Sequence, residues 1–368
     1  MSDAGLRLAP VRTRRELREF VELPLLLHPK GMSVPLWESA IRRWHGRPDV
    51  ELWVVRDASG GVVGRSTLHA DDRMSQRLGG PTLLLGATEM ASPAAFAALA
   101  EHAEATARDR GARQLLGPVS LLPNQTGGVI TSGWGERGFV DSPWNPAWYP
   151  DVWEAQGFTR SFTGATWICE RLPDVDPHLF DRGASDRRVV IRRGSRRDLG
   201  SQVPMLRELL NVSFAQLPYY TQITADEMAE ATDGLAHLLD ERLLLWAEVD
   251  GVPAAFVLVV PDLSDVVMAG GGRLGPREAV RILARRFLPA RGRRREAVLI
   301  VKGTRPEYQG RGLNRILSAH LLRGLQEGGY ETLRSTFVGD DNPASAAQYE
   351  RMGGRRLHGT TFYRREVT

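Results

Sequence analysis

The chain has 368 residues, 42% of them hydrophobic, so it can bury a substantial core and is long enough for two domains. Its 48 basic residues are offset by 44 acidic ones, and its basic clusters at 192–197 and 291–296 lack the interleaved aromatic side chains that stack on bases, so no nucleic-acid partner is expected. A single cysteine, Cys169, excludes an internal disulfide framework and a zinc site built on cysteines, and we expect it to be structural and expect no metal.

The N-terminal segment "MSDAGLRLAPVRTRRELREF" lacks the apolar stretch of a signal peptide. No segment reaches the roughly 20 continuous apolar residues of a membrane span. We therefore expect a soluble, cytoplasmic protein with no membrane partner.

The first half reads as a mixture of helices and strands. A helix is predicted over 13–27, and a β-hairpin over 51–70, where Asp-Ala-Ser-Gly-Gly separates two β-rich runs. A strand over 81–90 precedes a helix over 92–111. That helix has Ser92 as a predicted N-cap, and it carries Pro93 at its first position.

The stretch 171–200 is rich in Pro, Asp, Gly and Arg and separates two regions that each look self-contained. We place a boundary near residue 180. The predicted domains are therefore 1–180 and 181–368.

The second half repeats the order of the first. Helices are predicted over 201–214 and 223–240, followed by a hairpin over 243–262 that turns at Asp250–Gly251. A buried strand over 296–302, a helix beginning near 313 and a strand over 331–338 follow. The ends of the halves also correspond, since Asn145-Pro146 and Tyr149 resemble Asn342-Pro343 and Tyr349. Two copies of one mixed α/β domain are indicated.

The loop "RPEYQGRGLNRIL" (305–317) joins the strand over 296–302 to the following helix. A glycine-bearing loop at a helix N-terminus presents unpaired main-chain N–H groups, which bind anions such as a pyrophosphate. Gly310 and Gly312 let the main chain approach the phosphates, and Arg311 or Arg315 can add positive charge. The spacing matches neither a nucleotide-triphosphate P-loop nor a dinucleotide-binding Gly-x-Gly-x-x-Gly.

The block 296–366 resembles the GNAT acyltransferase superfamily. The family's pyrophosphate loop, Gln/Arg-x-x-Gly-x-Gly/Ala, is matched at Gln309 and Gly312, while Asn314 replaces its final small residue. Downstream, 342–353 is similar to the family's Asn-x-x-Ala…Tyr-Glu-x-x-Gly segment, and Gly354 stands where phenylalanine is common. Nearly the whole chain also resembles bacterial tandem GNAT proteins of uncharacterised substrate.

The resemblance implies an α/β (mixed α+β) fold of two tandem GNAT-like domains, each a mostly antiparallel central sheet flanked by helices. It implies transfer of an acyl group from acyl-CoA, with acetyl-CoA as the expected donor, to a small amine. Tyr349 occupies the position of the family's general acid; a core tyrosine is the alternative interpretation. The residues implied in cofactor binding are Ile300, Val301, Lys302, Gln309, Gly310, Arg311, Gly312, Leu313, Asn314 and Asn342.

Other residues keep two interpretations each. Asn342 fits either the coenzyme side of the site or a turn cap. Glu248 and the Tyr219–Tyr220 pair fit either a substrate pocket or ordinary packing. His320 is expected to be structural, and His358, in a predicted last hairpin, either faces the substrate or is merely exposed. Aromatic residues near the end of the first half are expected to fill its core, with a pocket lining as the alternative: Trp134, Trp144, Trp148, Tyr149 and Trp153.

The first half lacks a glycine–arginine loop, because "GATEMASPAAFAAL" offers neither Gly-x-Gly nor a basic residue. We therefore expect it not to hold a CoA pyrophosphate and to supply one wall of the acceptor pocket. Two alternatives to the acyltransferase are an aminoacyl transferase of the Fem type and a CoA-binding sensor or scaffold without catalytic activity.

Overall fold

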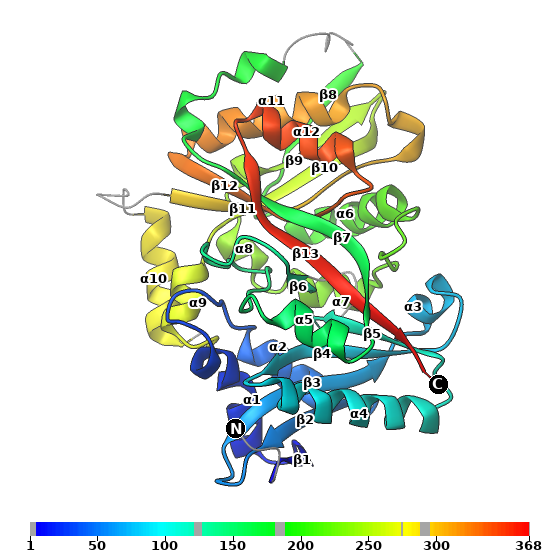
Figure 1. Ribbon diagram of the computed structural model, residues 1–368. Coiled ribbons are helices and arrows are strands. Elements are labelled where there is room, and N and C mark those ends of the chain that lie inside the picture. Colours follow the sequence, from blue (N-terminus) through cyan, green and yellow to red (C-terminus); the bar gives the residue numbers. More distant parts are fainter. Residues whose placement is uncertain (1–4, 121–126, 181–187, 274, 288–294, 368) are drawn as a thin grey trace. The chain divides into compact units, whose positions relative to one another are not determined.

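The computed structural model describes residues 5–120, 127–180, 188–273, 275–287 and 295–367 (Figure 1). The chain forms two compact units. Unit 1 comprises Met1–Ala165, Leu263–Val280 and His358–Thr368, and unit 2 comprises Thr166–Asp262 and Arg281–Leu357. The division into 1–180 and 181–368 stays a prediction, and both 181–187 and most of the basic cluster 291–296 lie outside the described residues.

Unit 1 has a mixed sheet flanked by helices. Its strands run in the order β1-β2-β3-β4-β5, antiparallel up to β4 and parallel between β4 and β5. The strands are β1 (Arg7–Pro10), β2 (Val50–Arg56), β3 (Val62–Ala70), β4 (Thr82–Met90), β5 (Gln114–Val119) and β6 (Val129–Ile130). The helices are α1 (Arg14–Leu27), α2 (Glu38–His45), α3 (Asp72–Arg77), α4 (Pro93–Asp109), α5 (Tyr149–Ala155) and α9 (Ser264–Ala269).

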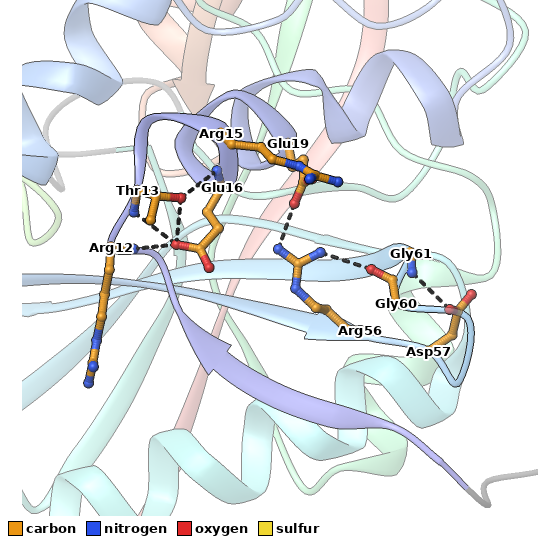
Figure 2. A network of polar contacts seen from close by, with 9 residues as sticks. All are labelled: Arg12, Thr13, Arg15, Glu16, Glu19, Arg56, Asp57, Gly60 and Gly61. Atoms are coloured by element: carbon orange, nitrogen blue, oxygen red, sulfur yellow. Dashed lines mark hydrogen bonds and ion pairs between the residues drawn. The ribbon is translucent and has the colours of Figure 1, made fainter.

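Local sequence signals explain how α1 starts and how it is tied to the sheet (Figure 2). Thr13 caps the helix by accepting from the Glu16 main-chain N–H at 3.2 Å, and the Glu16 carboxylate accepts from the Thr13 N–H at 2.8 Å. Further along the helix, Glu19 accepts from Arg56 at 2.5 Å, and Arg56 also donates to the carbonyl of Gly60 at 2.9 Å. The predicted helix over 13–27 and hairpin over 51–70 are therefore confirmed, and one arginine joins them.

Unit 2 repeats this layout with its own mixed sheet, in the order β7-β12-β11-β10-β9-β8. Only β11 and β12 among β8–β12 pair in parallel. The strands are β8 (Val189–Arg193), β9 (Leu244–Val249), β10 (Val252–Pro261), β11 (Arg295–Thr304) and β12 (Tyr330–Gly339). The helices are α6 (Leu199–Phe214), α7 (Ala225–Ala231), α8 (Leu235–Leu238), α11 (Leu313–Glu327) and α12 (Pro343–Arg351), with short 3₁₀ turns η1 (Leu172–Asp174), η2 (Pro177–Phe180), η3 (Glu241–Leu243) and η4 (Pro306–Tyr308).

The last strand of each repeat is exchanged. Strand β7 (Thr159–Cys169) follows the first repeat in sequence but is the neighbour of β12, while β13 (Arg355–Glu366) follows the second repeat and pairs with β5. The register of the latter pair runs from Tyr363 opposite Gly117 to Glu366 opposite Gln114. In Figure 1, β13 is the red strand beside β7 in green. The two repeats are therefore tandem in sequence but interlinked in structure.

Some elements differ from the prediction. Strand β8 lies inside the stretch predicted as a linker, where Arg192 bonds to Glu248 of β9 at 3.0 Å. The segment 342–366 ends in the single strand β13 instead of a hairpin. Helices α9 and α10 (Pro276–Phe287) were not predicted. Within the described ranges, no helix combines the length and apolar character needed to cross a bilayer.

Candidate active site

Two parallel strands of unit 2 stop pairing partway along their length. Strands β11 and β12 pair from Arg295 to Leu299, and no pairing between them continues beyond Leu299 opposite Ser335. A β-bulge on the other side of β11 accompanies the separation, because Leu258 faces Val301 and Val259 faces Leu299, leaving Ile300 as the extra residue. The predicted segment Ile300–Lys302 therefore lies where the strands diverge.

The loop between β11 and α11 exposes main-chain N–H groups at a helix N-terminus. The Gln309 N–H donates to the Pro306 carbonyl at 3.1 Å, and pairing resumes at Arg315, whose N–H donates to Gly312 at 3.0 Å. Between them, the N–H groups of 310–314 donate to no other described residue. The positive end of the α11 dipole lies at the same place. These are the features of an anion site.

Both loop glycines adopt backbone conformations that other residues rarely reach. Gly310 has φ 75° and Gly312 has φ 78°, and Gly312 is the N-cap of α11. A side chain at Gly310 would meet no atom within 4 Å, so its Cα side faces open space. Arg311 is exposed and its guanidinium carbon lies 5.0 Å from the Tyr308 ring centroid. A phosphate in the loop would have a mobile positive charge beside it.

Three other predicted loop residues hold the loop in place. The Gln309 side chain donates to the Thr304 carbonyl at 3.3 Å, and the Asn314 side-chain oxygen accepts from the Thr304 hydroxyl at 3.0 Å. Leu313 is 2% exposed and belongs to the unit 2 core. Asn314 thus ties the first turn of α11 to the end of β11.

The predicted acid Tyr349 is buried on α12, with 1% of its surface exposed. Its ring stacks on Trp167 at 5.9 Å between centroids. Burial raises the pKa of Tyr349 well above its ordinary value, and a hydrogen bond with Ser335 lowers it in part. The phenol is therefore protonated at neutral pH, as a proton donor must be.

Both the main chain and the side chain of Lys302 lie in the candidate site. Its ammonium nitrogen lies 2.9 Å from the Gln348 side-chain oxygen and 4.4 Å from the Tyr349 ring centroid. Lys302, Asn314 and Tyr349 line one small cavity together with apolar residues of β10, β11 and α11. Burial lowers the pKa of Lys302 to about 7, so the amine exists in both protonation states at neutral pH. The residue pattern had indicated only its backbone; a lysine directly after the apolar run "AVLIV" is the signal for its burial.

Several other candidates have structural partners. Asn342 is the N-cap of α12, accepting from the Ser345 N–H at 3.2 Å. Glu248 accepts from Trp246 at 3.0 Å as well as from Arg192. The Tyr220 hydroxyl donates to Asn211 at 2.7 Å, and Tyr219 packs edge-on against Phe337. These contacts support the packing interpretation for Glu248 and both tyrosines.

In unit 1, His358 is fully buried and lies 3.2 Å from the Glu136 carbonyl, so it is not merely exposed. Trp153 is also fully buried and stacks on Tyr363 at 5.4 Å. Trp144 donates to the Glu136 carbonyl at 3.0 Å. Trp144, Tyr149 and Trp153 also line a cavity, so both interpretations of these aromatic residues hold in part.

Comparisons with known proteins agree with this fold. Residues 204–354 match the Acetyltransferase (GNAT) family. The chain is 25% identical to Protein YghO of Escherichia coli over 96% of this chain and 94% of that protein. It is 24% identical to a bacterial ceramide synthase of Caulobacter vibrioides over 96% and 95% of the two chains. A solved tandem GNAT protein from the clavulanic acid biosynthesis pathway superposes with a TM-score of 0.58 over 99% of both chains, at 16% identity.

Proposed function

We propose that the protein transfers an acyl group from acyl-CoA to a small amine, because residues 204–354 match the Acetyltransferase (GNAT) family and the fold is that of tandem GNAT proteins. The observation that carries the proposal is the row of N–H groups at 310–314, free of other described partners, at the N-terminus of a 15-residue helix. This row suits the pyrophosphate of the coenzyme.

Acyl transfer also requires hydrogen-bond donors that polarise the thioester carbonyl. The divergence of β11 from β12 supplies them. In our proposal the thioester lies along Ile300–Lys302, where main-chain N–H groups released from pairing with β12 polarise its carbonyl oxygen. The amine nitrogen attacks the carbonyl carbon, the carbon–sulfur bond breaks, and the amine loses a proton. The departing thiolate takes a proton from the Tyr349 hydroxyl, which is protonated at neutral pH, and the proton lost by the amine returns the Tyr349 phenolate to a phenol.

The identities of the acceptor amine and of the acyl group are part of this proposal. The sequence predicts acetyl-CoA as the donor. A ceramide is an N-acylated amino alcohol, so the name of the Caulobacter relative agrees with amide formation on an amine and favours testing longer acyl groups. Acetyl-CoA and long-chain acyl-CoAs should therefore be compared as donors.

The experiment is a calorimetric titration of the wild type and of Gly312→Glu with acetyl-CoA and longer acyl-CoAs. A carboxylate in the loop should repel the pyrophosphate and lower affinity at least about 100-fold. Gly111→Glu is the matched control, because Gly111 has φ 68° and no neighbour within 4 Å and belongs to unit 1, so this variant places the same charge at a similar backbone conformation outside the glycine loop. Equal affinity in the wild type and Gly312→Glu would refute the pyrophosphate site.

Two alternatives make different predictions. An aminoacyl transferase of the Fem type would bind charged tRNA; in the described part of the chain no helix exceeds the 17 residues of α4, which is too short for a coiled-coil arm of that kind. A CoA-binding sensor would bind acyl-CoA without turnover on any amine of a broad panel. Binding tests with tRNA and turnover tests with amines separate the three.

A further inference from the structure

Unit 1 contains a cavity at the place where its own parallel strands separate. Among the described residues, strands β4 and β5 pair from Thr82 opposite Gln114 to Gly86 opposite Val119 and no further. The cavity begins there, with Ala87–Glu89 of β4 on one side and Pro118–Ser120 on the other. It is open to solvent and has a volume of about 110 Å³.

One carboxylate is held rigidly in the wall of this cavity. The Glu89 oxygen Oε2 lies 2.8 Å from the buried His28 Nε2 and 3.1 Å from the Tyr149 hydroxyl, whose one proton is shared between Glu89 and the Met90 carbonyl at 2.9 Å. That hydroxyl is itself fixed by the main chain of Met90, whose N–H donates to it at 3.1 Å. No described residue donates to the other oxygen, Oε1, and 15% of the Glu89 side chain is exposed. One oxygen of the carboxylate is thus held by protein groups, and the other can accept a hydrogen bond from a ligand.

The backbone before Glu89 is unusual. Arg65 of β3 faces Glu89, whereas Thr67 faces Gly86, so Ala87 and Thr88 stand opposite the single residue Ser66. Ala87 has φ 47°, a left-handed conformation that costs about 1 kcal/mol for a residue other than glycine. This bulge sets the position of Glu89 in the cavity wall, as bulges beside binding sites commonly do.

The cavity lining holds two carboxyl groups, Glu89 and Asp141, and one guanidinium, that of Arg65. The Arg65 side chain is only 3% exposed, donates to the Phe20 carbonyl at 2.5 Å and lies with its guanidinium carbon 4.9 Å from the Phe20 ring centroid. Trp37, Trp144 and Trp153 line the same cavity. A carboxylate and aromatic side chains in one cavity suit an organic cation.

We propose that this cavity is a second ligand site, which binds a small primary ammonium ion with an apolar body. The ammonium group donates to Oε1 of Glu89, and the body packs against the tryptophans. The proposal does not rest on the acyltransferase function, since all the residues that it uses belong to unit 1, whereas the glycine loop belongs to unit 2.

The test is a calorimetric titration of the full chain at pH 7 with hexylammonium and with 1-hexanol, which has the same body without the charge. The wild type should bind hexylammonium at least about 10-fold more tightly, the effect of one charge-assisted hydrogen bond in a buried site. Glu89→Gln should remove this preference and leave hexanol binding unchanged. Glu101→Gln, at an exposed position of α4, is the control.

Equal binding of the ammonium ion and the alcohol by the wild type would overturn the proposal, and this comparison requires no variant to fold. An unchanged preference in Glu89→Gln would also overturn it. Gly312→Glu should still bind hexylammonium, so loss of the pyrophosphate site and loss of this site can be told apart.

Discussion

The buried amine of Lys302 allows a quantitative test by the substitution Lys302→Met. Burial lowers its pKa from 10.5 to about 7. Well below pH 7, both the folded and the unfolded chain carry the proton, and the folded protein bears the full cost of a charged, buried amine. The difference of about 3.5 pH units corresponds to about 5 kcal/mol. Methionine has a similar length and no charge, so the variant should be more stable than the wild type in this range.

The sign of the pH dependence follows from which state holds the proton. Between pH 7 and 10.5 the unfolded chain binds a proton that the folded chain lacks, so raising the pH stabilises the wild type. The advantage of Lys302→Met should therefore shrink by about 1.4 kcal/mol per pH unit from pH 7 upwards. The lost hydrogen bond to Gln348 adds an offset that does not depend on pH in this way.

The measurement is urea unfolding of both proteins at pH 6, 8 and 9. The chain has only one other lysine, the exposed Lys30, so Lys30→Met is the matched control and should show no such trend. The same scarcity lets an NMR titration of labelled lysine resolve Lys302 directly. A stability difference that stays constant from pH 6 to pH 9 would refute the reasoning.

Two further predictions concern buried groups of unit 2. Tyr349→Phe should lower kcat/KM for amine acylation by about 100-fold or more, which is the usual contribution of a positioned acid. The affinity for acyl-CoA, measured by calorimetric titration, should stay within about twofold. Undiminished turnover would assign Tyr349 to the core alone. Cys169 is fully buried, and burial raises its pKa to about 12. Iodoacetamide at pH 8 should therefore leave it unmodified in the native protein and alkylate it in urea, which mass spectrometry can measure. Rapid labelling of the folded chain would contradict its structural role.

Elements with strong local signals could be predicted from the sequence. The hairpin at Asp250–Gly251 is confirmed, and both residues have positive φ, as the turn requires. Helix α4 begins at Pro93 with Ser92 as its cap, as predicted. These features depend on a few neighbouring residues, so the sequence states them directly.

Features that depend on distant partners could not be predicted. The sequence predicts a linker at β8, because Val189 and Ile191 stand among polar and arginine-rich residues. These residues form a strand by pairing with β9. The cluster around Glu89 joins residues about 60 positions apart. Its one local signal is a carboxylate in the otherwise apolar run "LLLGATEM". In the glycine loop, by contrast, the N–H groups of the proposed pyrophosphate site belong to five consecutive residues, 310–314, so a local pattern is enough to predict such a site.

The exchange of β7 and β13 determines how the chain can be built. The edge of β5 pairs with residues 363–366, which are synthesised about 250 positions later. During synthesis the first repeat therefore leaves the ribosome with an open sheet edge, which other chains could join. Cutting the gene near residue 180 would give two polypeptides that each lack a strand of their own sheet. Each repeat therefore needs the other to complete its sheet, even though each carries its own core.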